Sequence, residues 1–563
     1  MGVMDFRGSR RVWITAAAAV SAVVALTLSA TGCSLGHSES DAEALVRHFT
    51  EALDHQDVTN AAALTSYPNA ATATIQQMFD GLKADAVDYK LTQFIGLDDA
   101  SGFFTMDVAW HIGENKDWIY SVQGSVRRLA VGWRISWDPS VVMPELGHQR
   151  TVKLIRTDAA PPLVDALNGP VLMAEQPVNA ILLDPAKMPD PGATTAAVAA
   201  TIEPVAPLVT SQTLLQDLVV AQGKPITAVT LRDPDFEILG PALTGIPGVS
   251  VEKQPRLLSV DRRIGSPVLD GLRNLWQANR DTTAGWAVQT FEADGKPAVR
   301  MAGYQGPPGP DIAATMDTRL QLAATDAVAS IATPAAIVAI QPSTGSVLAV
   351  AQNGSATDLG PIALTGLFPA GSNLDLFKTA AGAETGTPPS DVTADDTVQY
   401  ASRLGLGVDF KIPGLNETTG RLPESGMGLE PARSEPTNSD AVLVSPFGMA
   451  VAAATVTHGN LVIPQIALGH PGSTLAHPEP LRPDVIERLR ARMREAANGP
   501  GTEALHAFPD VVGMPATTGP DQWFVGNRGD VAFAVFAQNP ETTDTAMKLT
   551  SRMFAALVSQ PAA

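Results

Sequence analysis

The stretch FPAGSNLDLFK, residues 368–378, decides the fold of the C-terminal half of this chain. Its proline and glycine predict a turn, and the residues that follow predict a helix beginning near Ser372. Ser372 and Asp375 have the spacing of a capping box, in which two side chains accept hydrogen bonds from the backbone of the first helical turn. The local pattern therefore favours a turn that leads into a helix capped by these two residues.

A serine at this place is also a candidate nucleophile. Acyl-serine enzymes need a lysine one helical turn after the serine, because its amine takes the proton of the hydroxyl group. Asp375 occupies that position here, and Lys378 lies six residues from Ser372, on a different face of the helix. Loss of a positioned base lowers a reaction rate by about 100-fold to 10,000-fold. We therefore expect Ser372 to be catalytic only if another base, such as Asp375, serves it.

The stretch resembles the Pro-Gly-Ser-x-x-Lys turn that presents the nucleophile in penicillin-binding proteins. Other segments are similar to helices and strands of the penicillin-binding transpeptidase domain: residues 316–324, 335–341, 346–352, 445–450, 523–526 and 546–558. Over its exported part, the chain resembles the actinobacterial penicillin-binding lipoproteins, which are class B penicillin-binding proteins. The resemblance implies a multidomain α+β protein in which residues 313–563 form a transpeptidase-like α/β domain of the serine β-lactamase type.

The strand that carries the family's Lys-Thr-Gly motif reads Thr517-Thr518-Gly519 in this chain. In the family, this strand pairs with the substrate, and its lysine attracts the substrate carboxylate. Thr518 and Gly519 match the motif, whereas Thr517 replaces the cation that would bind a carboxylate. Asp375 in place of the first lysine adds repulsion. We expect weak binding, or none, of a peptidoglycan stem peptide or a β-lactam.

The family's Ser-x-Asn motif has no counterpart between Ser372 and Ser445. Only a short polar stretch, residues 385–399, stands where relatives have further helices, which indicates that this lobe is deleted. The Gly-x-Gly of the family is also replaced, by Asn-Ser-Asp at residues 438–440. Because all these departures remove catalytic parts while the apolar segments persist, they indicate a domain that keeps its core without its chemistry.

The N-terminus has the pattern of an export signal. Basic residues precede an apolar run from residue 12 to about residue 28, and small residues then lead to Cys33. This order predicts a lipoprotein signal at residues 1–33, with lipidation of Cys33. The alternative is an uncleaved transmembrane helix, since residues 12–32 are long enough to span a bilayer. Both interpretations predict an exported protein anchored at the outer face of the cytoplasmic membrane.

Residues 38–146 predict a small α+β domain. Ser40 and Glu43 have capping-box spacing ahead of a helical pattern, and later segments alternate apolar and polar residues as half-buried strands do. The resemblance implies an NTF2-like cone. A set of aromatic residues in the strands favours a packed core, and the alternative is a cavity that would make this domain a small-ligand sensor. The set comprises Trp110, Trp118, Tyr120 and Trp133.

Residues 147–312 alternate Pro-rich joints with short strand-like and helix-like pieces. The resemblance implies an extended linker or dimerisation module. This region contains a literal Ser-x-x-Lys sequence, from Ser250 to Lys253. We expect it to lie in a loop rather than at a turn that enters a helix, so we interpret the match as coincidental.

The composition excludes several classes of function. The chain has 563 residues, a net charge of -20 and 1 cysteine. Binding of nucleic acid needs clustered Lys and Arg, so we expect no nucleic-acid partner. One cysteine excludes an intramolecular disulfide or a multi-cysteine metal site, and the 9 histidines show no ligand spacing. We expect neither a metal nor a cofactor.

These observations favour a membrane-anchored, penicillin-binding-protein-like pseudoenzyme of the cell envelope, linked to peptidoglycan synthesis and cell wall organisation. We expect a binding or scaffolding role, with cell-wall synthesis or division proteins as partners. The first alternative is an active DD-transpeptidase or carboxypeptidase that uses Ser372. The second is a ligand sensor that acts through the NTF2-like domain.

Overall fold

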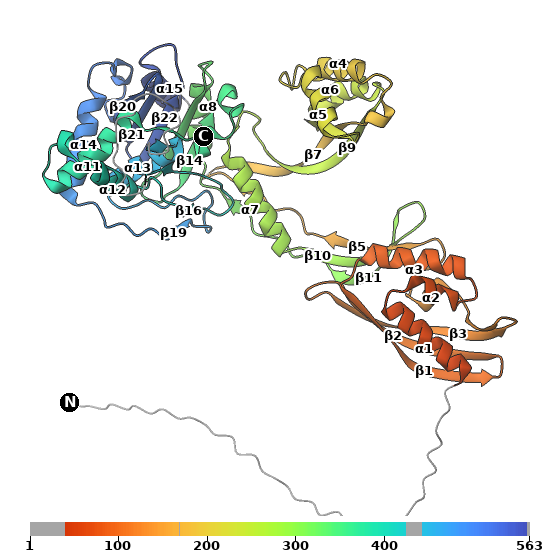
Figure 1. Ribbon diagram of the computed structural model, residues 1–563. Helices are drawn as coiled ribbons and strands as arrows, with labels where there is room; N and C mark the ends of the chain where they lie inside the picture. The colour runs from red at the N-terminus through yellow and green to blue at the C-terminus, as the bar shows by residue number, and fades with distance from the viewer. Residues whose placement is uncertain (1–39, 168, 424–441, 560–563) are drawn as a thin grey trace, which may run out of the picture. The chain divides into compact units, whose positions relative to one another are not determined.

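The computed structural model describes residues 40–167, 169–423 and 442–559. It divides into two compact units, and each is described by itself (Figure 1). The first comprises the described residues up to Leu154 together with Gln289–Met301, and the second comprises Ile155–Val288 with the described residues from Ala302 onward. Cys33 and residues 438–440 lie outside the described residues. The expected domain limits at residues 146 and 312 stay predictions.

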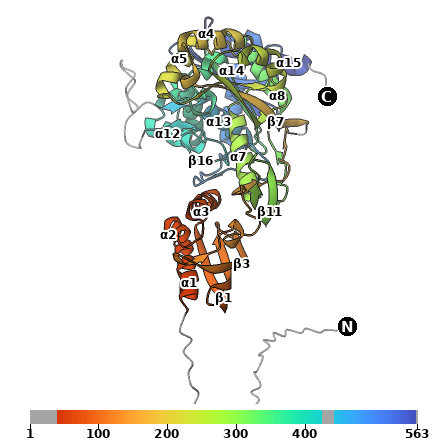
Figure 2. The same cartoon turned by 90° about the vertical axis from the view of Figure 1, so that its right-hand side faces the viewer.

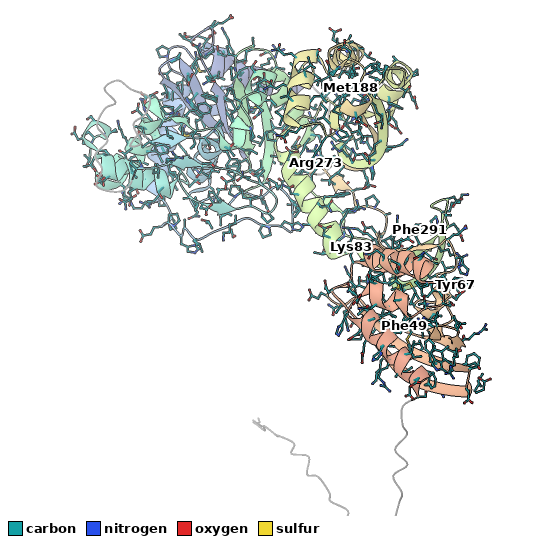
Figure 3. All side chains as sticks on the ribbon, turned by 45° about the vertical axis from the view of Figure 1, so that its right-hand side comes forward. Phe49, Tyr67, Lys83, Met188, Arg273 and Phe291 are labelled. Atoms are coloured by element: carbon teal, nitrogen blue, oxygen red, sulfur yellow. The ribbon has the colours of Figure 1, made fainter. Side chains whose placement is uncertain are left out.

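Three helices open the first unit: α1 (Asp41–Asp54), α2 (Val58–Ala63) and α3 (Pro68–Leu82). Helix α1 begins where the sequence predicts, because the Ser40 hydroxyl accepts a hydrogen bond from the Glu43 N–H at 3.1 Å. Its apolar residues recur on one face, and Phe49, labelled in Figure 3, is fully buried there.

An antiparallel sheet packs against these helices, with strand order β1-β2-β3-β4. Along β2, every second residue is buried, including Phe104, Met106, Val108 and Trp110. This period of two confirms the predicted half-buried strands and the α+β class of the domain. The strands are β1 (Ala86–Asp98), β2 (Ser101–His111), β3 (Asp117–Leu129) and β4 (Gly132–Ile135).

A three-stranded sheet follows, with order β11-β10-β5. Next comes a sheet with order β12-β6-β7-β8, in which β9 also pairs with β7. Helices α4, α5 and α6 cover this second sheet around a small apolar core that includes Met188, labelled in Figure 3. The strands are β5 (Thr151–Thr157), β6 (Val164–Asp165), β7 (Val171–Leu183), β8 (Ile226–Arg232), β9 (Val249–Ser259), β10 (Gly285–Phe291), β11 (Pro297–Tyr304) and β12 (Ile312–Ala313); the helices are α4 (Pro191–Ile202), α5 (Ser211–Val220), α6 (Asp233–Thr244) and α7 (Val268–Thr282).

Ser250 and Lys253 lie in strand β9, so the expectation of a loop is wrong. The turn signals just before them, in particular Gly248 at φ 85°, end the preceding connection rather than continue through these residues. In a strand, residues three apart face opposite sides, so this serine and lysine cannot act as a pair. Lys253 instead forms an ion pair with Asp233 at 3.0 Å.

The C-terminal part is built on a five-stranded antiparallel sheet, with order β14-β13-β22-β21-β20. Its central strands are buried on both faces. Along β22, Phe533 and Val535 face one core, whereas Ala534 and Phe536 face the other. Its strands are β13 (Ala335–Ile340), β14 (Val347–Gln352), β20 (Val511–Thr518), β21 (Asp521–Arg528) and β22 (Val531–Ala537).

Helices α8 (Thr318–Val328) and α15 (Thr545–Ser559) pack together on one face of this sheet, as Figures 1 and 2 show. The other face packs on α13 (Pro446–His458), in which Pro446–Val456 are all buried. Such a helix is apolar all round, as a helix enclosed in a core must be. These positions confirm the strands and helices predicted for this part.

The remaining elements of the C-terminal part are helices and short strands outside the main sheet. They are α9 (Gly354–Thr357), α10 (Ile362–Thr365), α11 (Leu374–Thr385), α12 (Ala394–Arg403), α14 (Pro483–Ala497), β15 (Phe368–Pro369), β16 (Phe410–Lys411), β17 (Gly420–Arg421), β18 (Leu443–Val444) and β19 (Ser473–Thr474). Within the described ranges, none of the helices is long and apolar enough to cross a membrane.

Candidate functional site

Ser372 lies in a tight turn that docks on the edge of the main sheet. Strand β15 ends at Pro369, and a 3₁₀ turn, Gly371–Asn373, then leads into α11. Gly371 has φ 52°, a left-handed conformation that favours glycine. A Cβ atom at Gly371 would lie 2.1 Å from Thr518 Oγ1 and 2.3 Å from the Thr517 carbonyl oxygen. Only a glycine therefore allows the turn to come this close to β20.

The Ser372 hydroxyl bonds to the backbone of β20 on both sides of one residue. It accepts a hydrogen bond from the Thr517 N–H at 2.8 Å and donates one to the Thr517 carbonyl oxygen at 3.3 Å. Strand β20 is at the edge of its sheet, so these are the groups with which it would pair with a further strand. A backbone carbonyl is not a general base, so this arrangement holds the hydroxyl proton without activating the oxygen.

The capping box predicted for Ser372 and Asp375 is wrong. Helix α11 begins after Asn373, and no side chain caps its first turn. The reason is that Ser372 bonds to Thr517, which is 145 residues away in sequence, instead of to its own helix. Asp375 is exposed in the first turn of α11. Among the described residues, neither Asp375 nor Lys378 has a side-chain hydrogen bond or an ion pair.

Thr517, Thr518 and Gly519 lie at the end of β20, next to the Ser372 turn. The Thr518 hydroxyl donates a hydrogen bond to the Pro369 carbonyl oxygen at 2.9 Å. Gly519, at φ 57°, begins the connection to β21. The structure thus brings Ser372, Thr517 and Thr518 together, but the Ser372 hydroxyl is bonded to Thr517 and the Thr518 hydroxyl to Pro369.

A hollow of about 240 Å³ opens beside Ser372. Of the residues that line it, none carries a charge: Ser372, Pro515, Ala516, Thr517, Gln522, Trp523, Thr543 and Met547. A carboxylate entering this hollow would lose its water without meeting a cation, which disfavours its binding. The volume lies below the usual range of small-ligand pockets, about 300–1,000 Å³.

A buried carboxyl group that the sequence analysis did not single out lies in the same domain. Burial raises the pKa of Glu417 to about 7, and the charge of Asp409 adds to this rise. The Oε2 atom of Glu417 is buried and has no hydrogen-bond partner. The neighbouring Thr418 and Thr419 carbonyl oxygens both accept from the Ser445 hydroxyl. Glu417 belongs to no motif and to no predicted helix or strand, so no pattern in the sequence marks it.

The aromatic residues of the N-terminal domain form a connected core. The indole N–H of Trp110 donates to the Tyr120 hydroxyl at 3.0 Å, and this hydroxyl donates to the Val142 carbonyl oxygen at 2.8 Å. Burial raises the pKa of Tyr120 well above its ordinary value. Trp118 packs on Tyr120 with ring centroids 4.5 Å apart, while Trp133 is half-buried. These polar groups bond to one another, which argues against their serving as ligand contacts.

Within the part of the chain that the structure describes, no three His, Cys, Asp or Glu side chains gather where they could hold a metal ion. The Ser372 hollow contains no residue of these types. Nothing in the geometry of this site therefore suggests metal ligands.

Comparison with known protein families gives one match. Residues 41–150 match the family described as the NTF2-like N-terminal transpeptidase domain. A search of curated proteins found no match. The matched residues contain helices α1–α3 and the sheet β1–β4. The N-terminal domain of this chain is therefore NTF2-like, of the type that precedes a transpeptidase domain in penicillin-binding-protein-like chains.

Proposed function

We propose that this protein is a catalytically inactive, penicillin-binding-protein-like component of the cell envelope that binds or scaffolds other proteins in peptidoglycan assembly. Lipidation at Cys33 would anchor it to the outer face of the cytoplasmic membrane. The family match of residues 41–150 supports the cell-wall context. Asp375 and Thr517 stand where the family has lysines, and these replacements support the inactivity.

One observation carries the proposal: the Ser372 hydroxyl occupies both outward backbone groups of Thr517. A peptide substrate would need this edge of β20 to add as a further strand, and it would have to displace the serine first. The serine would then need a base, and the neighbouring Asp375 is an exposed carboxylate, which is a weaker base than the lysine amine of the family. Binding and activation of a substrate are thus both opposed at the same point.

The hollow beside Ser372 supports the same conclusion from charge. Peptides that end in D-alanine and β-lactams both carry a carboxylate, and the residues that line the hollow offer it no cation. The partners of the protein would accordingly be other envelope proteins, namely cell-wall synthases or division proteins, and would contact surfaces other than this hollow.

A fluorescent penicillin tests the proposal. The full-length protein is incubated with the probe, and covalent labelling is read by gel and by intact mass. We expect no labelling of the folded wild-type protein and none of Ser372→Ala. Ser250→Ala serves as a control for the other Ser-x-x-Lys sequence, in β9. A double variant, Asp375→Lys with Thr517→Lys, restores both cations and asks whether they are sufficient for acylation.

Stoichiometric labelling of the wild type that disappears in Ser372→Ala would overturn the proposal. The protein would then be an acyl-serine enzyme with an unusual base, which is the principal rival. The retained position of Ser372 against Thr517 and Thr518 is the observation that favours this rival. The two readings differ in one measurable quantity, the fraction of wild-type protein acylated.

A further inference from the structure

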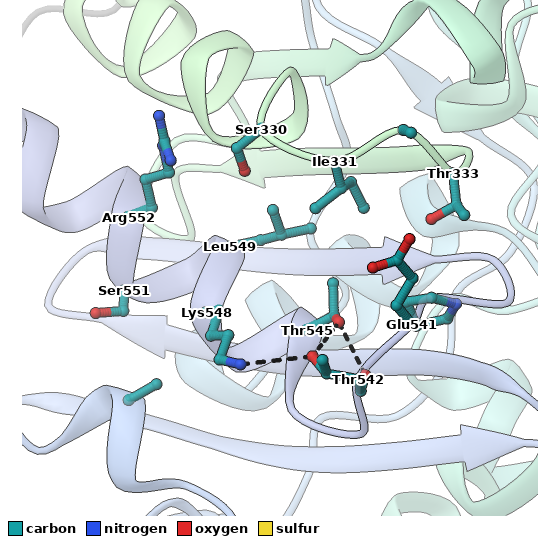
Figure 4. A pocket seen from close by; sticks show the side chains of 13 residues that line it. Ser330, Ile331, Thr333, Glu541, Thr542, Thr545, Lys548, Leu549, Ser551 and Arg552 are labelled. Atoms are coloured by element: carbon teal, nitrogen blue, oxygen red, sulfur yellow. Dashed lines mark hydrogen bonds between the residues drawn. The ribbon is translucent and has the colours of Figure 1, made fainter.

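A second hollow, of about 700 Å³, lies on the face of the main sheet that α8 and α15 cover, which is the face opposite α13. One wall is residues 330–333, which follow α8; another is the loop at residues 540–542; and the floor is one face of α15 (Figure 4). Thr545, Lys548, Leu549 and Arg552 follow the i, i+3, i+4, i+7 pattern, so they share that face. None of these residues belongs to the Ser372 hollow.

Buried polar side chains hold both walls in place. The Asn353 amide donates hydrogen bonds to the carbonyl oxygens of Val328, Ile331 and Thr333, at 3.3, 3.0 and 2.7 Å. On the other side, the Gln522 amide donates to the Thr542 carbonyl oxygen at 2.6 Å. The hollow is thus formed by ordered backbone, as a binding site requires.

The charges of the hollow are divided between its two ends. Lys548 forms an ion pair with Asp544 at 2.8 Å, so its charge is offset. Arg552 and Glu541, by contrast, have no ion pair or side-chain hydrogen bond among the described residues. Figure 4 shows Arg552 beside Ser330 at one end and Glu541 below Thr333 at the other. One end therefore offers a free cation and the other a free carboxylate.

Between its charged ends, the hollow is apolar on one side, while on the other side Thr542, Thr545 and Lys548 are hydrogen-bonded to one another. Ile331 and Leu549 lie between the two charged ends in Figure 4, and Ala332, Ala504 and Pro540 also line it. Hydroxyl groups of Ser330 and Ser551 stand near the end that carries Arg552. The complementary ligand has an anionic end, a small aliphatic body and a cationic end, and its volume is that of a few amino-acid residues.

From this arrangement, we propose that the hollow under α15 binds a short aliphatic peptide with free termini, whose carboxylate meets Arg552 and whose amino group meets Glu541. This site does not depend on the state of Ser372. It adds a small-peptide ligand to a protein whose transpeptidase-like hollow carries no charge.

Calorimetric titration of the full-length protein with trialanine tests the site. We expect saturable binding with a Kd below about 1 mM, the affinity that a ligand of this size reaches at an ordinary efficiency per atom. N-acetyl-trialanine loses the cationic end and trialanine amide loses the anionic end. Each should bind at least about tenfold more weakly, since a charge-assisted contact is lost.

Variants assign each contact to its end. Arg552→Gln should weaken trialanine binding about tenfold and should abolish the difference between trialanine and its amide. Glu541→Gln should likewise weaken trialanine binding about tenfold, and it should abolish the difference between trialanine and N-acetyl-trialanine. Arg492→Gln and Glu495→Gln, an exposed pair on α14, are matched controls that should change neither. Ala332→Trp, at the exposed rim, should block the hollow and remove binding of all three peptides.

Three results would overturn the proposal. The first is no saturation at trialanine concentrations on the order of 10 mM. The second is equal binding of trialanine and its acetylated and amidated forms. The third is binding that survives both Arg552→Gln and Ala332→Trp, which would place the peptide elsewhere on the protein. All of these substitutions are at exposed positions, and circular dichroism of each variant serves to check that it folds.

Discussion

The hollow beside Ser372 and the hollow under α15 belong to the same domain, and they differ in what their polar groups do. Beside Ser372, about 240 Å³ of space is lined by uncharged residues, and the serine hydroxyl is bonded to Thr517. Under α15, about 700 Å³ is lined by residues that include Arg552 and Glu541, both unpaired among the described residues. The Ser372 motif is thus conspicuous in the sequence, but its serine hydroxyl is hydrogen-bonded within the protein. The hollow under α15 carries no sequence motif, but its charged side chains are available to contact a ligand.

The substitution with the largest expected effect, Asn353→Ala, disrupts the hollow under α15 and leaves the hollow beside Ser372 intact. Asn353 accepts hydrogen bonds from the Ala335 and Ala356 N–H groups and donates to three carbonyl oxygens. Asn353→Ala leaves these buried groups without partners, so we expect the free energy of unfolding to fall by about 4 kcal/mol. Denaturant unfolding measures this loss, and trialanine titration of the folded fraction measures the accompanying loss of binding.

Asn527→Ala is the control for Asn353, because Asn527 makes one long contact to the Gly529 carbonyl oxygen. We expect a change below about 0.5 kcal/mol there. An equal effect of the two substitutions would show that Asn353 does not hold the wall of the hollow.

The second prediction separates the Ser372 turn from β20. In Gly371→Ala, a Cβ atom would clash with Thr517 and Thr518 while the backbone stays at φ 52°. We expect a loss of about 3 kcal/mol, from steric overlap and left-handed strain together. The thermal unfolding midpoint should fall by roughly 6 to 12 °C. Gly354→Ala has open space around it and should leave the midpoint unchanged; if both variants unfold alike, the docking of the turn contributes nothing.

The smallest expected effect is a pH dependence on the α13 side of the sheet. The folded-state pKa of Glu417 is about 7, above its ordinary value of 4.5, because the side chain is buried. Between these two pH values, the folded chain binds more protons than the unfolded chain, so stability falls as pH rises through this window and then levels off. Glu417→Gln should remove this fall. A pKa rise from 4.5 to about 7 corresponds to at most about 3.4 kcal/mol, and because the side chain is partly exposed we expect a fall on the order of 2 kcal/mol.

Chemical unfolding of wild type and Glu417→Gln at pH 4 and pH 8 measures this difference. Asp409→Asn is the matched variant, because Asp409 is the second cause of the raised pKa. It should reduce the fall in stability without abolishing it. The same change in stability between the two pH values in wild type and in Glu417→Gln would contradict the burial of a protonated Glu417.

Local patterns predicted the elements well where burial follows one face of one element. The period of two in β2 and the apolar runs of β13 and β14 are examples. Strand β1 escaped prediction because only its first residues alternate, and most of the later ones are exposed. The Ser250–Lys253 segment was assigned to a loop because turn residues precede it, although its own residues pair with β7.

The candidate site was predictable only in part, because its contacts join distant segments. The turn at Ser372 and the strand at Thr517 were both predicted. The bond between them was not, since spacing within one helix cannot reveal a partner on another element. The α15 hollow could not be predicted from a local pattern either, because its walls come from segments distant in sequence: residues 330–333, Ala504 and residues 540–552.

The pairing of β13 with β22 sets the order in which this domain can be completed. Ala335 pairs with Ala537, so strand β13 can form this pairing only after β22, the middle strand of the sheet and much later in the sequence, has been made. Until β22 is made, the apolar helix α13 lacks the β22 residues against which it packs. Contacts so distant in sequence slow folding and leave an open strand edge exposed meanwhile. A chain that stops before residue 531 would therefore be a substrate for aggregation or proteolysis rather than a shorter version of the protein.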